Sequence, residues 1–499
     1  MLNGAIALVT LAVLYTAARI AKRMRASAPL LPRVGRAGPL GYAWAVLRSV
    51  LDSEGLVAEG CARFGGRPFV LPSMSGEWVV LGPENVELLR RSDDSVFNAP
   101  ERAKQLFLPN VMFGDITTDP YHLETLIRSD LTKALKSLVP EIREEAQLAI
   151  PAHLPMKNAE TSVTVPLFPT MVHLVARVSN RAMIGAPGCR DEAFLKSQVA
   201  VAEEVIPMSQ ILRWFPALLR PIVWKLFCVT VGAKDRAVRL VRPYVQARIA
   251  YAQQDNPGTI VDLLLRYAPA ADLADSARLS VRVVHLNMAA IHTSAIFTTH
   301  ALFELARMPP ADVDEIRAEI RAAVAAAGSV NKAAVDRFFL LDSLLKEIGR
   351  VHALFAVGSS RVLLREAALA DGTVLPAGSV VALAPRPLHR SAAAYPAPHA
   401  FDAFRFARLR ADGPGGAGAG AQHAFTALSN DYIVFGLGKH GCPGRFFAAL
   451  KIKVILAELL LQYDVAFPAG ASRAPKPFAF NIFTVPNPTA ELVFTRREA

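Results

Sequence analysis

A glycine-rich loop with a single cysteine carries the residue types that metal chemistry needs. The loop reads Phe435-Gly-Leu-Gly-Lys-His-Gly-Cys-Pro-Gly444, and the apolar run Ala448 to Leu461 predicts a following helix with Pro443 at its first position. A cysteine at a helix N-terminus meets the positive end of the helix dipole, which favours the thiolate. The loop has no second cysteine, which excludes a CxxC redox pair or a cysteine-based zinc site there. Cys442 is therefore predicted to be a thiolate metal ligand; the alternative is a structural cysteine in a glycine turn.

A long helical pattern offers a second chemical surface. It runs from Leu279 to Met308 and stops at the following two prolines. Four of its residues recur at helical spacing and share one face, namely His285, Ala289, His292 and Ile296. Small side chains on that face leave room for a flat ligand close to the helix backbone.

The cysteine loop resembles the haem-binding signature of the cytochrome P450 family, Phe-x-x-Gly-x-x-x-Cys-x-Gly. In that family the cysteine thiolate is the axial ligand of haem iron, and its electron donation favours O–O cleavage. The resemblance implies that haem is the cofactor and that Cys442 is its proximal ligand. It also implies that Phe435 packs near the sulfur and that His440 reaches a haem propionate.

The resemblance extends to a charge network. Glu347 and Arg350 lie three residues apart, on one face of a predicted helix. This spacing alone is weak evidence, because Glu87 and Arg90 share it and are interpreted as an exposed pair. Arg405 matches the family arginine that joins such a Glu and Arg in a buried network behind the haem. Two arginines and one glutamate can satisfy each other's charges and donors, and the loss of one strands the others.

Three further residues are candidates for haem propionate contacts. Arg361 matches a position where the family often has a basic residue, although a lone arginine in a strand is usually a surface residue. The family's Trp-x-x-x-Arg pattern has no match near residues 121–128, where His122 and Arg128 are the remaining candidates.

The stretch Ala289 to Ser294 resembles the family's oxygen-activation motif, small-Gly-x-acid-Thr-Thr/Ser. Thr293 matches the first threonine, whereas His292 replaces the acid and Ala290 replaces the glycine. The resemblance implies that Thr293 and His292 relay protons, since a histidine can do so near neutral pH. The alternative for His292 is a hydrogen-bonded helix residue. Similar Ala-Ala-x-His-Thr stretches occur in fungal branches of the family, which favours a fungal microsomal enzyme of secondary metabolism.

The composition bounds the function classes. The chain has 499 residues, of which 52% are hydrophobic and 20% charged, and it has four cysteines. These values exclude global disorder and a disulfide scaffold. The net charge of +12 comes from basic residues that are scattered and not interleaved with aromatics, so no nucleic-acid partner is predicted. The basic surface suits an acidic protein partner or an anionic membrane instead.

The order of elements predicts a mainly α fold with small β-sheets, as in the P450 fold. Hairpins are expected at Gly66 to Leu81 and Val374 to Leu383, and helices at Ala311 to Ala327 and Phe338 to Val351. The glycine-rich stretch Ala411 to Ala424 imitates a dinucleotide loop, but no strand leads into it, so a surface insertion is predicted.

The N-terminus predicts a membrane anchor. Leu2 to Ala18 carries no charge, and four basic residues follow, namely Arg19, Lys22, Arg23 and Arg25. We divide the chain into a transmembrane anchor (1–20), a basic, proline-rich connector (21–40) and a haem-thiolate catalytic domain (41–499). The positive flank predicts a single pass with the catalytic domain in the cytosol, and the resemblance to microsomal members of the family implies the endoplasmic reticulum membrane. The alternative is a cleaved secretory signal.

The expected function is a haem-thiolate monooxygenase that uses O2 and electrons from NADPH through a separate flavoprotein reductase. By analogy with the family, a lipophilic terpenoid, steroid or polyketide-like substrate would contact Phe107, Ala289, Ala290, Thr293, Val357, Ile482 and Phe483. Two alternatives remain open. One is a haem-thiolate isomerase or dehydratase that needs neither reductase nor O2, and the other is a non-catalytic haem-binding protein.

Overall fold

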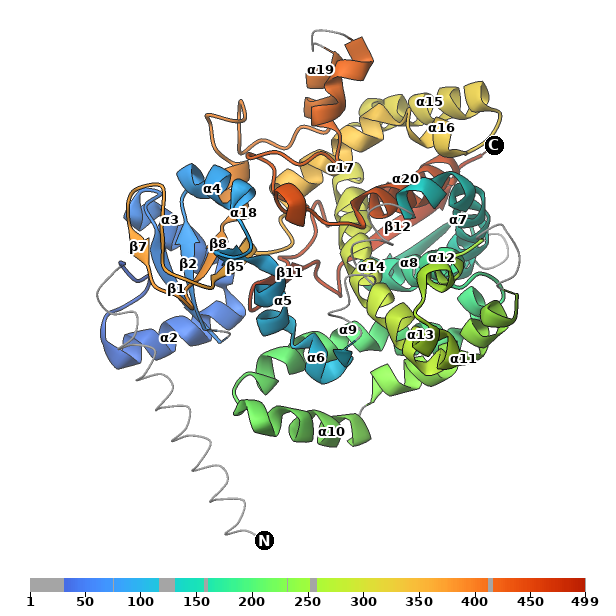
Figure 1. The fold of residues 1–499 in the computed structure, drawn as a ribbon. Coiled ribbons are helices and arrows are strands. Elements are labelled where there is room, and N and C mark those ends of the chain that lie inside the picture. The colour runs from blue at the N-terminus through green and yellow to red at the C-terminus, as the bar shows by residue number, and fades with distance from the viewer. Residues whose placement is uncertain are drawn as a thin grey trace.

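Helices form most of the body, with small sheets at its sides (Figure 1). The structure, a computed structural model, describes residues 31–74, 76–115, 131–156, 160–230, 232–251, 258–411 and 416–498. The longer helices of that part are α2 (Gly38–Leu51), α3 (Ser53–Phe64), α5 (Ala99–Phe107), α7 (Leu131–His153), α8 (Leu167–Met183), α9 (Glu192–Leu212), α10 (Arg220–Thr230), α11 (Ala233–Tyr251), α12 (Ile260–Tyr267), α14 (Ser276–Leu305), α15 (Pro310–Ala327), α17 (Phe339–Val351) and α20 (Arg445–Gln462). The shorter ones are α4 (Val86–Arg91), α6 (Pro109–Met112), α13 (Ala270–Ala274), α16 (Lys332–Val335), α18 (Pro385–His389) and α19 (Arg405–Ala411).

The largest described sheet has five strands in the order β1-β2-β8-β5-β3 and lies to one side of the helices (Figure 1). Its strands are β1 (Phe69–Ser73), β2 (Gly76–Leu81), β8 (Val380–Leu383), β5 (Gly358–Leu363) and β3 (Phe97–Asn98). β1 and β2 form the predicted hairpin, with Ser73 opposite Gly76. The smaller sheets are formed by β4 (Ser162–Pro166), β12 (Glu491–Arg496) and β9 (Tyr463–Ala466), by β10 (Phe478–Phe480) and β11 (Phe483–Val485), and by β6 (Ala367–Ala368) and β7 (Val374–Leu375).

The predicted hairpin at Val374 to Leu383 is wrong. β7 pairs with β6, whereas β8 lies between β2 and β5 in the large sheet. The pairing of β8 with β2 is parallel and joins residues about 300 positions apart. The turn signal favours pairing with the nearest strand in sequence, but burial of β8 between β2 and β5 sets its actual pairing.

α14 is the central helix of the body, and Figure 1 shows it crossing the middle of the molecule. It packs on α8, α9, α11, α17 and α20. The Asp275 side chain caps it by accepting a hydrogen bond from the Ala277 amide, so the helix begins and ends three residues earlier than predicted. Because most of its length is buried against other helices, the residues that it leaves exposed define a space inside the body.

Only part of the predicted N-terminal anchor and connector lies within the described residues. The proposed anchor, residues 1–20, lies outside the described residues, and no helix within them is both long enough and apolar enough to cross a bilayer. The last residues of the predicted connector already belong to the body. Val34 donates to the Val70 carbonyl at 3.0 Å, Val70 donates to the Pro32 carbonyl at 2.8 Å, and α2 starts at Gly38.

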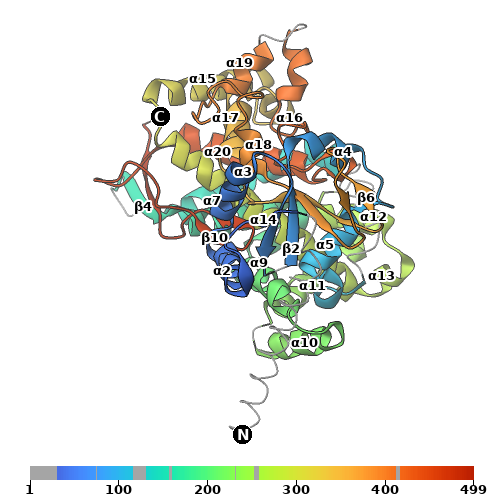
Figure 2. The ribbon, with the colours of Figure 1, turned by 90° about the vertical axis from the view of Figure 1, so that its left-hand side faces the viewer.

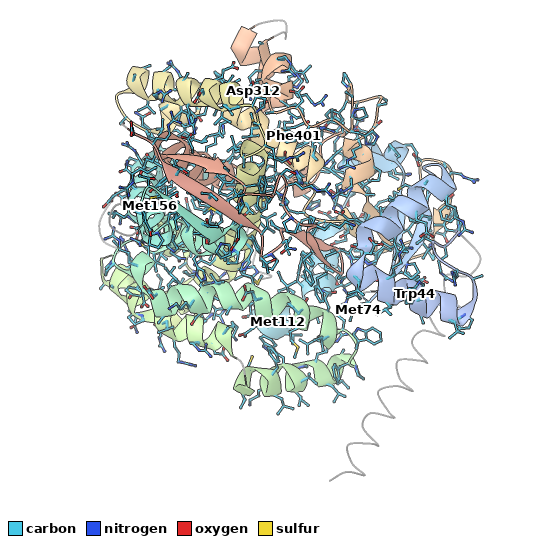
Figure 3. All side chains as sticks on the ribbon, turned by 180° about the vertical axis from the view of Figure 1, so that it is seen from behind. Trp44, Met74, Met112, Met156, Asp312 and Phe401 are labelled. Carbon is cyan, nitrogen blue, oxygen red and sulfur yellow. The ribbon has the colours of Figure 1, made fainter. Side chains whose placement is uncertain are left out.

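Two helices carry apolar faces toward solvent. On α2 the exposed residues Leu40, Trp44, Leu47 and Leu51 follow the spacing of one helix face. Trp44 is labelled in Figure 3. Near α10 the exposed apolar residues are Leu218, Leu219, Ile222, Leu226 and Val229. Figures 1 and 2, which differ by a quarter turn, place both helices on the lower side of the molecule.

Candidate active site

The cysteine loop is closed by its own backbone. The Cys442 amide donates to the Phe435 carbonyl at 2.6 Å, and α20 begins three residues later. At Gly438 the backbone has φ +52°, and a Cβ there would lie 2.7 Å from the Arg90 carbonyl oxygen, so only glycine fits. These contacts hold the cysteine at the start of α20, as the sequence predicted.

Cys442 is partly exposed and is not part of a disulfide. Burial raises the pKa of its thiol, whereas the backbone amides of Gly444 and Arg445 and the Arg445 charge act in the opposite direction. A Cβ at Gly444, two residues after the cysteine, would stand in open space. The sulfur lies at a helix N-terminus whose amides favour the thiolate. This arrangement fits a planar group bound through its metal.

The exposed face of α14, which packs on α20, is a second wall of the candidate site. Ala289 and Thr293, one helical turn apart, are exposed, whereas Ile291, Ser294 and Ala295 are buried. The Thr293 hydroxyl donates to the Ala289 carbonyl at 2.8 Å. The one exposed stretch of this buried helix thus carries small or short polar side chains. Such side chains leave room for the predicted haem and for a small molecule beside it.

His292 points to a different neighbour. Its Nε2 lies 3.8 Å from Oε1 of Glu203 on α9, and neither ring nitrogen has a hydrogen-bond partner within the described residues. His292 lowers the pKa of the Glu203 carboxyl. The distance is that of a weak ion pair rather than a hydrogen bond. Sequence reasoning missed Glu203, because its pairing with α14 exists only in the folded chain.

Arg361 of β5 lies near His440 of the cysteine loop. Arg361 is almost completely buried in β5, its Nε has no hydrogen-bond partner among the described residues, and burial lowers its pKa to about 10. His440 lies with its Nε2 2.6 Å from the Asp94 carboxylate, which also pairs with Lys439 at 3.0 Å. A buried cation with an unused donor fits an anionic group such as a propionate. Two other propionate candidates, His122 and Arg128, lie outside the described residues.

Glu347, Arg350 and Arg405 form one buried cluster. Arg350 donates to both carboxylate oxygens of Glu347 at 2.7 Å, and Arg405 donates to them at 3.2 and 3.3 Å. The guanidinium groups also bond to backbone carbonyls, those of Pro398 and Ala400 from Arg350 and that of Pro396 from Arg405. By contrast, the Glu87–Arg90 pair is at the surface. The cluster fastens the segment 396–405 to α17.

Four of the predicted substrate contacts gather in one apolar cluster. Val357 and Ile482 are buried there, and Phe107 and Phe483 pack against it. Backbone bonds hold the group together, since the Ala356 amide donates to the Ile482 carbonyl at 2.8 Å. The remaining three, Ala289, Ala290 and Thr293, belong to α14.

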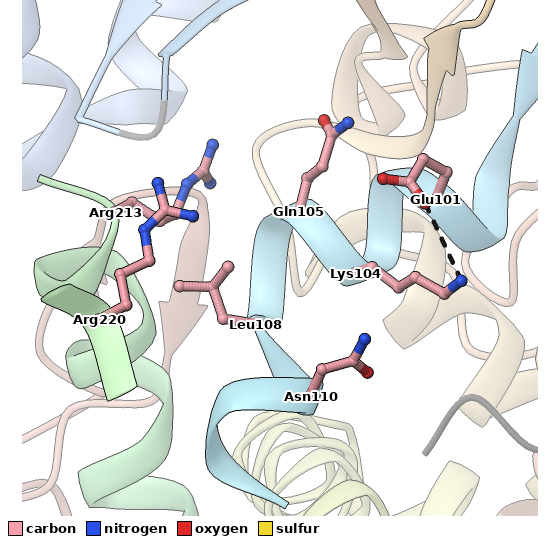
Figure 4. A pocket seen from close by; sticks show the side chains of 7 residues that line it. All are labelled: Glu101, Lys104, Gln105, Leu108, Asn110, Arg213 and Arg220. Atoms are coloured by element: carbon pink, nitrogen blue, oxygen red, sulfur yellow. Dashed lines mark ion pairs between the residues drawn. The ribbon is translucent and has the colours of Figure 1, made fainter. Parts of the chain in front are cut away.

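A polar pocket of about 470 Å³ lies between α5 and the end of α9. Figure 4 shows Arg213 and Arg220 on one side and Glu101, Lys104 and Gln105 of α5 on the other. It contains none of the predicted substrate contacts. It is close to them, however, because Phe107 is on the same helix, and Gln210 of α9 bonds both to the Leu106 carbonyl and to Asn481.

Comparisons with known proteins agree with this geometry. A model of the family described as Cytochrome P450 matches residues 92–494. The chain is 29% identical to cytochrome P450 monooxygenase 103 of Postia placenta over 98% of both chains. It is 31% identical to cytochrome P450 monooxygenase 71 of the same organism over 89% of each chain. It is 28% identical to ent-kaurene oxidase P450-4 of Gibberella fujikuroi, over 94% of this chain and 92% of the relative.

Proposed function

Because the chain belongs to the cytochrome P450 family, and is thus a haem-dependent oxidoreductase of the monooxygenase type, we propose that it oxygenates a lipophilic substrate with electrons supplied by a separate NADPH-dependent flavoprotein reductase. The balanced reaction is R–H + O2 + NADPH + H⁺ → R–OH + H2O + NADP⁺. The observation that carries the proposal is the placement of the Cys442 loop and the exposed Ala289–Thr293 face of α14 on two helices that pack together.

The residues of the candidate site have different roles in the proposed reaction. Cys442 binds the haem iron as a thiolate, and haem supplies the oxygen-activating chemistry. Arg361, with its unused Nε donor, binds a propionate, and the Glu347 cluster supports the loop from behind. The Thr293 hydroxyl both accepts and donates a proton at Oγ1, so it can pass protons across the open face of α14.

The apolar cluster that includes Phe107, Val357 and Ile482 supports a lipophilic substrate class. A terpenoid, steroid or polyketide-like molecule would bury apolar surface there. One relative is named an ent-kaurene oxidase, so ent-kaurene, an apolar hydrocarbon, is a suitable first probe. The exposed apolar faces of α2 and α10 lie on one side and would rest on a membrane surface. We propose the endoplasmic reticulum membrane, with residues 1–20 as anchor.

The test uses the full chain in microsomes with an added NADPH-dependent reductase, and ent-kaurene together with a panel of lipophilic candidates. We expect a reduced-CO Soret band of a thiolate haem and products that carry one oxygen-18 atom from labelled O2. Turnover that persists without NADPH would support the isomerase alternative. Substrate-induced spectral shifts without any product from the panel or from host extract would support a haem-binding protein without catalytic activity.

A further inference from the structure

Lys451 is a lysine buried completely in the middle of the molecule. It is on α20, nine residues after Cys442, and its ammonium enters the space between α8 and α14. Nζ donates to the Ser179 hydroxyl of α8 at 2.7 Å and to the Ala290 carbonyl of α14 at 3.1 Å. Nζ also lies 5.0 Å from the centre of the Phe447 ring. The Ser179 hydroxyl donates in turn to the Val175 carbonyl at 2.6 Å, so its oxygen is available to accept from the lysine.

No carboxylate within the described residues neutralises this ammonium, and burial alone lowers its pKa, to about 7. α8 and α14 contribute only neutral polar groups nearby, including Asn180 and Asn287, which bond to each other at 2.8 Å. The charged groups of the packed helices have partners elsewhere, namely Lys453 with Asp342, Glu458 with Arg143, and Glu145 of α7 with Arg177 and Arg190. A buried and unpaired ammonium destabilises a fold, so its presence calls for a role other than stability.

The contact with Ala290 suggests that role. In one turn of α14, two consecutive carbonyls each accept a side-chain donor. The Ala289 carbonyl accepts from Thr293, and the Ala290 carbonyl accepts from Lys451. Side-chain donors to helix carbonyls fix or bend a helix locally. The donor to Ala290 comes from the helix that starts beside Cys442, so Lys451 joins the two walls of the site.

We propose that Lys451 is a positioning residue, which holds the Ala289–Ala290 step of α14 and so orients the Thr293 hydroxyl. The structural part of this proposal depends only on the contacts above. Its consequence for turnover rests on the proposed monooxygenase function.

The first test measures the hydrogen–deuterium exchange of peptides that cover residues 286–298 in the haem-loaded protein. Lys451→Met keeps the length of the side chain and removes the charge and the donors. Lys453→Arg is the control, because it changes another buried lysine of α20, one that bonds to Asp342 and not to α14, and keeps the ion pair. We expect Lys451→Met to speed exchange in these peptides about tenfold, the effect of losing one charge-assisted hydrogen bond, and the control to leave them unchanged. Equal exchange in parent and Lys451→Met, or the same acceleration in the control, would overturn the proposal.

The second test checks that the lysine is buried and unpaired. Its pKa in the folded protein, about 7, lies below the value of about 10.4 in the unfolded chain. Between these pH values the unfolded chain holds the extra proton, so the stability of the parent must rise with pH. Lys451→Met should lack this part of the rise in unfolding temperature between pH 7 and 9, and it should fold well, because an apolar side chain replaces an unpaired charge. Parallel curves for parent and variant would contradict the buried, unpaired state.

The third test measures peroxide released for each NADPH consumed. A misplaced Thr293 hydroxyl should raise the peroxide fraction severalfold in Lys451→Met, while the reduced-CO band stays intact. If the parent has no such band, the proposed function fails. If the band is present and Lys451→Met exchanges amide hydrogens faster, yet releases no more peroxide per NADPH than the parent, the orientation of Thr293 by Lys451 is refuted. The proposed function stands in that case.

Discussion

The rings of Phe297 and Phe435 stack with their planes 11° apart and their centres 6.4 Å apart. Phe297 is on α14, one turn beyond Thr293, and Phe435 opens the loop that ends at Cys442. Both rings also contact Phe425, at 5.3 and 4.9 Å. Aromatic rings at these separations attract one another beyond their buried area. The three rings therefore set the spacing between the cysteine loop and the open face of α14.

Phe435→Ala should loosen that spacing. Loss of a fully buried phenylalanine costs about 3–5 kcal/mol, and the cost should be smaller here because Phe435 is partly exposed. We expect a lower unfolding temperature and faster transfer of haem to an excess of a haem-binding acceptor protein. Phe435→Leu, which keeps apolar volume, is the control. If the alanine and leucine variants both lose haem at the parent's rate, the ring contacts do not set the spacing.

Cys442→Ser should abolish the reduced-CO Soret band of a thiolate haem. A hydroxyl does not ionise at neutral pH and donates electrons poorly to iron. The other three cysteines provide controls, because they lie outside the glycine loop that precedes α20. Burial raises the pKa of Cys61 to about 11, that of Cys189 to about 12 and that of Cys228 above its usual value, whereas at Cys442 the backbone amides of Gly444 and Arg445 oppose the effect of burial. Their serine variants should keep the band, and a loss of the band in any folded one of them would make the assignment of Cys442 wrong.

Glu347→Ala should prevent haem incorporation. It leaves Arg350 and Arg405 buried without their shared carboxylate, and breaking a buried charge cluster costs about 3–5 kcal/mol. The chain offers a matched control in Glu87→Ala, which breaks a pair of the same spacing at the surface. The control should change the unfolding temperature little. A haem-loaded Glu347→Ala protein with the stability of the parent would refute a supporting role for the cluster.

Sequence motifs predicted the parts of the site that are local in the chain. The Cys442 loop, the β1–β2 hairpin and the Glu347–Arg350 spacing depend on residues within a turn or two of each other, and the structure has them as expected. Only the family resemblance predicted a tertiary partner, Arg405 for Glu347, and the other tertiary partners were not predictable. Glu203 meets His292 across two helices, Asp94 meets His440 from far along the chain, and β8 pairs with a distant strand. Lys451 is visible in the sequence as an anomaly, since a lysine inside the apolar run of α20 is unexpected unless it has a special partner.

The exposed face of α2 should bind lipid together with the N-terminal segment. Deletion of Met1 to Arg25 should release the protein from microsomes only in part, because Leu40, Trp44, Leu47 and Leu51 remain exposed. Replacing Leu47 and Leu51 by serine in the deleted protein should complete the release, as measured by flotation with phospholipid vesicles. The haem spectrum should not change. Equal flotation of the deleted protein with and without the serines would exclude α2 as a lipid contact.

Thr293 and the His292–Glu203 pair are expected to act differently in proton delivery. Thr293→Ala should leave haem binding intact and raise the share of NADPH that is consumed as peroxide, because the hydroxyl on the open face of α14 is lost.

His292 faces Glu203 at 3.8 Å, so His292→Asp alone puts two carboxylates together and should lower the unfolding temperature slightly. His292→Asp with Glu203→Lys restores an attractive pair of reversed sign. The double mutant cycle should give a small coupling energy of about 0.2–1 kcal/mol, since Glu203 is largely exposed. If the pair also carries protons, the single variants should uncouple turnover and the double variant should recover it. If His292→Ala couples as well as the parent at every pH from 6 to 8, the histidine only fastens α14 to α9, and the protons pass through Thr293 alone.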